Sequence, residues 1–261
     1  MKYFNLIIAD LGRVIKSKPI YILLSVNFAL SAFNVFLMTV ILRVEIAGIE
    51  MDIGGEFFRL VVLSTFSVQN LGLFIGLAVS IFCGGDFSFN TIRNKIISGN
   101  SRIKIYMSAL AVALIIALFF FIVNFVISLI SAVIVSQGFY MTRGLIGTVA
   151  LFIPLYLAIT ATIIFVTMSL KSRVVAIGIN LGSIIFLSTV LMLLAMSPIS
   201  NYVIMSAPHG IVDLVAMEAM MMVGSTAING RFVSIALLVS IIYFVAFTIA
   251  GAIKFKYTGI K

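Results

Sequence analysis

The sequence has 261 residues, of which 63% are hydrophobic and 10% are charged, and its formal net charge is +9. An average soluble domain is about 45–50% apolar and about 25% charged, and the mean hydropathy here is +1.29, so the composition excludes a disordered protein, a disulfide-rich secreted domain and an ordinary cytosolic enzyme. We therefore expect an all-α membrane protein with a single transmembrane domain over residues 1–261.

The first segment, residues 3–17, has helical periodicity before the first long apolar stretch. The apolar side chains of this segment share one face: Phe4, Ile7, Ile8, Leu11, Val14 and Ile15. The residues on the other face are Asn5, Gly12, Arg13 and Lys16. This pattern predicts an amphipathic helix in the plane of the membrane interface; the alternative is a plain basic tail.

Six apolar stretches follow. A helix that crosses the hydrocarbon core of about 30 Å needs about 20 apolar residues. The stretches that meet this length, none of which contains Asp, Glu, Lys, Arg or His, are 19–42, 60–84, 106–136, 144–170, 174–196 and 232–253. A charge at the bilayer centre costs at least about 2.5–3.5 kcal/mol, so this absence predicts six transmembrane helices.

The basic residues predict the orientation of these helices, because cytoplasmic connections are enriched in Lys and Arg. Thirteen Lys and Arg lie in the N-terminal segment, the second and fourth connections and the C-terminal tail, and four lie in the remaining connections. We therefore expect both termini in the cytoplasm (N-in/C-in) and interpret the net charge as a topology signal. A lipid bilayer is an expected partner, and nucleic acid is not.

The connections on the predicted outer side differ in length. Residues 43–59 form an acidic loop, and residues 137–143 form a short turn. Residues 197–231 form a long apolar loop in which helical spacing predicts one or two short helices, in a position that would cap a pathway. Its one histidine, His209, is the only histidine of the chain and is interpreted as a polar residue at a helix end.

The most polar stretch is the second connection, residues 85–105, on the predicted cytoplasmic side. Ser88 or Asn90 is placed to cap a short helix that runs to about Ser98, and Gly99 is placed to end it. Ile92 and Ile96 share one face of this helix, with Phe89 one turn earlier, while Arg93 and Lys95 project to other sides. Such a basic, half-apolar helix suits docking onto a cytoplasmic protein; the alternative is an ordinary positive-inside loop.

Residues 86–102 resemble the signature of type-2 ATP-binding-cassette (ABC) exporter permeases. The matching residues are Thr91, Ile92, Arg93, Ser101 and Arg102, and Asp86 stands where the family usually has Glu. The sequence departs from the pattern at three places: Asn90 replaces the usual Gly, Gly99-Asn100 stands where Pro is frequent, and Ala109 stands where Lys is often found.

The resemblance implies that the segment is a cytoplasmic coupling helix between spans two and three, which docks into a groove of a separate ATPase subunit. The residues to which it gives this role are Asp86, Asn90, Thr91, Ile92, Arg93, Asn94, Lys95, Ile96 and Ile97. It also implies two ATPase subunits that bind ATP and Mg²⁺, a second permease (an identical copy or a sister chain) and the inner membrane of a bacterial cell.

No catalytic constellation is visible in the sequence. Cys83 is the single cysteine, and neither it nor His209 has the companions that a metal site needs. No phosphate-binding Gly-x-x-x-x-Gly-Lys-Ser/Thr run occurs, so we expect neither an enzyme nor a cofactor in this chain. The spans lack the ionisable residues that relay protons in secondary transporters.

Together these observations predict the permease subunit of an ATP-driven exporter whose cargo is amphipathic or hydrophobic, such as a peptide, bacteriocin, lipid or drug. The alternatives are a secondary transporter and a non-transporting immunity or helper subunit. The candidate cargo-facing residues are the asparagines of the spans: Asn27, Asn34, Asn70, Asn124 and Asn180. Their other interpretation is hydrogen bonding between helices. Two Gly-x-x-x-Gly pairs, Gly72 with Gly76 and Gly178 with Gly182, predict close helix packing.

Overall fold

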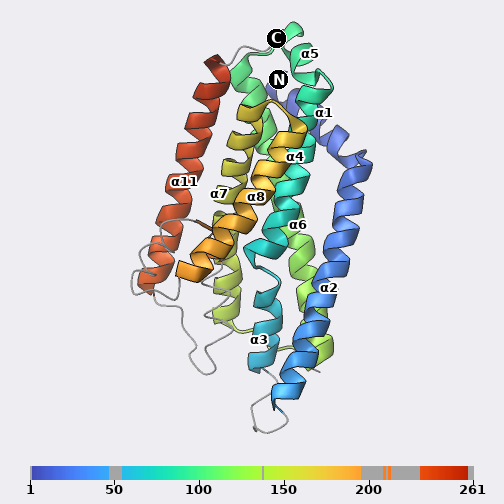
Figure 1. Ribbon diagram of the computed structural model, residues 1–261, viewed down its shortest axis with the longest axis vertical. Coiled ribbons are helices and arrows are strands. Elements are labelled where there is room, and N and C mark those ends of the chain that lie inside the picture. The colour runs from blue at the N-terminus through green and yellow to red at the C-terminus, as the bar shows by residue number, and fades with distance from the viewer. Residues whose placement is uncertain are drawn as a thin grey trace.

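A computed structural model describes residues 2–46, 55–136, 138–194, 208–209, 211–212 and 230–257. Over these residues the regular structure is helical throughout, and the main elements run along the long axis of a bundle (Figure 1). The elements are α1 (Lys2–Ile15), α2 (Lys18–Ile46), α3 (Gly55–Ser64), the π-helix η1 (Val68–Gly72), α4 (Leu73–Ser88), α5 (Thr91–Ile97), α6 (Arg102–Ser136), α7 (Arg143–Leu170), α8 (Arg173–Leu194) and α11 (Gly230–Tyr257).

Six segments of these helices are long and apolar enough to cross a membrane. They are Lys18–Leu37, Val61–Ser88, Arg102–Ile134, Leu145–Leu170, Arg173–Val190 and Val233–Tyr257. Each overlaps one of the six predicted stretches, so the protein is an all-helical, multi-pass membrane protein. Most of the predicted short helices between residues 197 and 231 lie outside the described residues, as do residues 47–54 of the acidic loop.

The short helices α1 and α5 lie at the same end of the bundle, which we call the α5 end (Figure 1). The last turns of α11 also reach this end: the Arg102 Nη1 donates a hydrogen bond to the Lys256 carbonyl oxygen over 3.4 Å, and the Phe87 and Phe255 rings lie 6.4 Å apart. At the opposite end, Phe58 of α3 packs edge-on against Phe139 in the turn between α6 and α7.

Glycines bring α4 close to α8. A Cβ atom on Gly76 would lie 2.8 Å from the Ile184 Cδ1, and one on Gly84 would lie 2.9 Å from the Arg173 Cα. The predicted close packing is therefore present at Gly76. It is wrong for Gly178 and Gly182, which face open space among the described residues, because the contact of α8 with α4 is made through other side chains.

The second predicted span is not one continuous helix. Its backbone leaves α3 after Ser64 and re-enters a helix at Val68, within the apolar stretch. A carbonyl group in the hydrocarbon region needs a hydrogen-bond partner inside the protein. Here the neighbouring helices supply the donors: Asn124 Nδ2 of α6 donates to the Thr65 oxygen over 3.0 Å, and the Tyr156 hydroxyl of α7 donates to the Phe66 oxygen over 2.7 Å.

This break depends on Tyr156. We predict that Tyr156→Phe lowers the free energy of unfolding by about 1–3 kcal/mol, because the buried Phe66 carbonyl oxygen loses the donor that this hydroxyl supplies. Unfolding in detergent, followed by circular dichroism, measures this change. The matched control is Tyr243→Phe, which removes a hydroxyl from a ring that packs against Phe247 on α11. Equal stabilities of the two variants would show that the hydroxyl does not stabilise the break.

Candidate functional site

Four helices meet in a cluster of charged side chains at the α5 end. The charge cluster consists of Asp10 and Arg13 of α1, Asp86 of α4, Lys95 of α5 and Ser108 of α6. Asp10 and Arg13 are one helical turn apart, so both side chains reach the same side of α1. The cluster therefore joins the N-terminal helix to both sides of the connection between the second and third spans.

Lys95 is shared between the two carboxylates. Its Nζ lies 2.9 Å from the Asp10 Oδ2 and 2.8 Å from the Asp86 Oδ2. Arg13 also bridges the two acids: its Nη1 lies 2.6 Å from the Asp86 Oδ1, and its Nη2 pairs with Asp10. The Ser108 hydroxyl donates to the Asp10 Oδ2 over 3.0 Å. The two acids and two bases thus form one network with no net charge.

Three of the four charged groups are almost completely removed from water, whereas the Arg13 side chain is 38% exposed. The exposed fractions are 1% for Asp10, 2% for Asp86 and 8% for Lys95. Burial by itself lowers the pKa of Arg13, but hydrogen bonds and charge from Asp86 and Asp10 outweigh it, and the pKa of Arg13 is raised. Arg13 therefore remains a cation in the cluster. A buried ion pair is strongly destabilised when one partner is removed, so the four groups depend on one another.

Two residues with left-handed backbone conformation, one before α5 and one after it, place Lys95 in this network. Asn90, with φ of +54°, turns the chain from α4 into α5, and Gly99, with φ of +86°, ends α5 as predicted. Asparagine and glycine are the residues that adopt this conformation most readily. Asn90 occupies the predicted cap position, but its side chain makes no capping hydrogen bond.

The predicted coupling residues divide into an inner and an outer set. Asp86, Ile92 and Lys95 are buried, Thr91 and Ile96 are half-buried, and Asn90, Arg93, Asn94 and Ile97 are exposed. Phe89, just before α5, is exposed like the outer set. The exposed fraction is 72% for Phe89 and 74% for Ile97.

Two predictions about faces were wrong. Phe89 does not share the buried face of Ile92, because the left-handed turn at Asn90 interrupts the helix and the spacing does not continue across it. Lys95 does not project away from the apolar face; it points inward, because Asp10 and Asp86 hold its ammonium group there.

The sequence interpretation missed Asp10 and Ser108. Asp10 lies beside the apolar face of α1, on the side where Val14 is buried against the bundle, while Phe4, Ile8 and Ile15 remain exposed. A signal was available: Asp10 and Asp86 are the two acids among the segments that contain the thirteen basic residues. An acid in so basic a surrounding indicates a specific ion pair.

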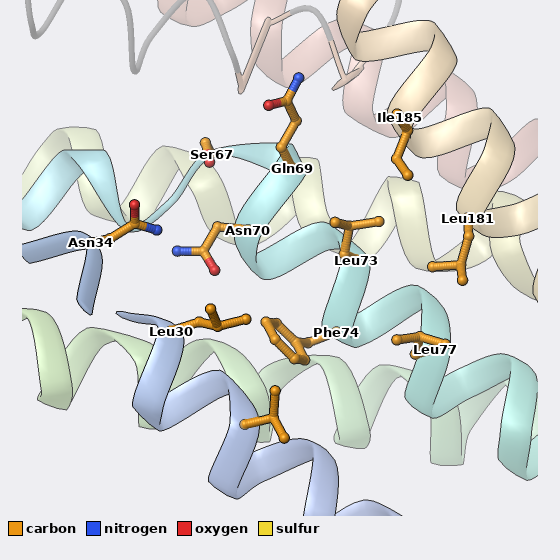
Figure 2. A pocket seen from close by; sticks show the side chains of 11 residues that line it. Leu30, Asn34, Ser67, Gln69, Asn70, Leu73, Phe74, Leu77, Leu181 and Ile185 are labelled. Carbon is orange, nitrogen blue, oxygen red and sulfur yellow. The ribbon is translucent and has the colours of Figure 1, made fainter. Parts of the chain in front are cut away.

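The five span asparagines have different surroundings. Asn124 accepts from the Ser31 hydroxyl over 2.9 Å, and Asn180 Nδ2 donates to the Ser80 and Thr167 hydroxyls over 2.7 and 2.9 Å, so these two join helices. Asn27 is fully buried, and its amide has no hydrogen-bond partner among the described residues. Asn34 and Asn70 line a groove of about 600 Å³ between α2, η1, α4 and α8 (Figure 2).

Within the described part of the chain, no three His, Cys, Asp or Glu side chains gather as a metal site. His209 is buried, and burial lowers its pKa to about 4, so its imidazole is neutral at neutral pH. No protein-family model matches the sequence, and no curated protein matches it.

We predict that Lys95→Met destabilises the protein by about 3–5 kcal/mol, because it leaves two buried carboxylates with one cation. Thermal unfolding in detergent measures the effect, and Lys104→Met, which removes an exposed lysine, is the control. The double variant Asp10→Asn/Lys95→Met restores neutrality, so its loss is expected to be smaller than the sum of the two single losses. Additive losses would show that the cluster does not act as one network.

Proposed function

We propose that this chain is the membrane-spanning permease subunit of an ATP-driven ABC exporter. In this proposal two permeases, identical or paired with a sister chain, form the pathway, and two separate ATPase subunits bind ATP and Mg²⁺. The cargo is amphipathic or hydrophobic. The proposed location is the inner membrane of a bacterial cell. The resemblance of residues 86–102 to the type-2 exporter signature supports the assignment.

The observation on which the proposal chiefly depends is the outer face of α5. Together with Phe89, which lies just before α5, it forms the docking face. The residues of the docking face, all exposed at the α5 end, are Phe89, Arg93, Asn94 and Ile97. Two large exposed apolar side chains at a bundle end, together with the exposed Arg93, are typical of a protein interaction site. Behind them, Lys95 and Ile92 fix the helix against the bundle. The inner side of α5 is bonded to the bundle and its outer side is exposed. Such a helix is suited to transmitting the movement of a bound partner to the bundle.

In the proposed mechanism, closure of the ATPase dimer pushes on this docking face. The displacement of α5 passes through Lys95 to Asp86 at the end of the second span and to Asp10 of α1. Asp10 is bonded in turn to Ser108 of the third span. Because both carboxylates and the Lys95 ammonium are buried, separating Lys95 from either acid is costly, so the four helices would move together at this end.

The proposal places the α5 end in the cytoplasm. Lys and Arg favour that side, and the exposed Phe4, Ile8 and Ile15 of α1 would lie among the lipids at the interface. Asn90 fits the family pattern in one respect: the usual residue there is Gly, and Asn90 has the left-handed conformation that glycine favours.

We predict that the orientation is measurable with single cysteines, because the one native cysteine, Cys83, is buried. In a Cys83→Ser background, Ser98→Cys at the α5 end should react with a membrane-impermeant maleimide only in inside-out vesicles. Phe139→Cys in the turn between α6 and α7 should react only in right-side-out vesicles. The reverse pattern would contradict the proposed N-in/C-in topology.

The decisive experiment is co-purification with whatever ATPase is encoded beside this chain, followed by measurement of ATP hydrolysis. We expect a stable complex with altered turnover. Phe89→Asp/Ile97→Asp should weaken the complex at least about tenfold, because two apolar contacts at the interface centre are lost. The control is Val174→Asp, at an exposed apolar position at the start of α8. The absence of a complex with the unaltered chain, or full assembly of the double variant, would contradict the proposal.

A further inference from the structure

The groove beside the helix break has a polar end and an apolar body. At the polar end, the amide groups of Asn34 on α2 and Asn70 on η1 point toward one another across the space between the helices (Figure 2). From there the lining continues along α4 to Leu77, which faces the same groove as Leu181 of α8. The rise of about 1.5 Å per residue gives the groove a length of about 10–15 Å along α4 between Asn70 and Leu77.

Asn70 has an unused hydrogen-bond donor. Its side chain is 8% exposed, and its Nδ2 has no partner among the described residues, although it lines the groove. A buried amide nitrogen without a partner is costly, and the lipid chains at this depth offer no acceptor. The group is therefore placed to receive an acceptor oxygen from a bound molecule.

The rest of the lining restricts what that molecule can be. Among the described residues, the side chains around the groove include no acid or base, and most are apolar, with Leu30, Phe74 and Leu77 along its walls. A charged ligand would lie in a low-dielectric site without a counter-charge, which is strongly unfavourable. The volume of about 600 Å³ is within the usual range of small-molecule sites.

We propose that this groove binds one neutral amphipathic molecule per chain. A carbonyl or hydroxyl oxygen of the molecule accepts a hydrogen bond from the Asn70 amide, and its hydrocarbon part lies along Phe74 and Leu77. The described lining of the groove comes from this chain. Its use as a cargo site rests on the proposed function, but its existence does not.

Photo-crosslinking tests the site without any ATPase. The probe is an N-methylalkanamide with a diazirine on its alkyl chain, added to the full chain in dioleoylphosphatidylcholine vesicles, and labelled positions are read by peptide mass spectrometry. We expect saturable labelling of α2, α4 and α8 around the groove. N-Methyldodecanamide should compete at least about fivefold better than dodecane or dodecyltrimethylammonium. Dodecane has no hydrogen-bond acceptor, and dodecyltrimethylammonium is charged and has none either, whereas the amide is neutral and supplies an acceptor oxygen. Labelling that does not saturate, or that spreads over the lipid-facing side chains of α11, would overturn the proposal.

Two variants keep the test independent of folding. Asn70→Leu should abolish the advantage of the amide over dodecane, and Leu77→Trp should reduce labelling by filling the apolar body. The control Asn5→Leu, at an exposed position on α1, should bind the probe like the unaltered chain. Because the Asn70 nitrogen has no partner among the described residues, Asn70→Leu should unfold at no lower temperature than the unaltered chain. A lower unfolding temperature would assign Asn70 a structural role and overturn the proposal.

Discussion

The pairing of two buried carboxylates with two cations is the interaction on which the α5 end of this protein depends. Asp10, Arg13, Asp86 and Lys95 come from three helices that are separated in the sequence. A carboxylate or an ammonium group buried there without a partner of opposite charge would carry a large desolvation penalty. The positions of α1, α4 and α5 are therefore linked: a shift of one helix lengthens ion pairs that the other two also share. This linkage gives the docking face of α5 a rigid support.

A second constraint comes from the membrane itself. Lipid offers no hydrogen bonds, so an interruption in a spanning helix survives only where the protein supplies partners. Tyr156 and Asn124 supply them at the break between α3 and η1. The same break displaces the chain and turns Asn70 toward the space beside α2. The groove and the Asn70 amide nitrogen, which has no partner among the described residues, therefore lie beside this break. This connects the fold of the second span to the proposed ligand site.

The two sites lie at different levels of the same span. The charge cluster contacts the last turn of α4, and the groove lies along its first turns. Along the same helix, Gly76 and Gly84 hold α4 close to α8. Because packed helices transmit displacement rather than absorb it, a movement of α5 under the proposed mechanism would act on the groove through α4 itself.

The sequence by itself determined the membrane class, the six spans and the short helix between the second and third spans. These follow from local quantities: the length of apolar runs, the absence of charge within them, and residues such as Gly99 that end a helix. The tertiary structure decided the rest. Whether Lys95 faces outward or inward depends on Asp10, 85 residues away, and whether Phe89 is buried depends on the backbone angle of Asn90. The break at Thr65 to Ser67 depends on donors from α6 and α7. Periodicity describes one helix at a time, whereas the partner of a buried charge, amide or carbonyl is set by which helices the fold brings together.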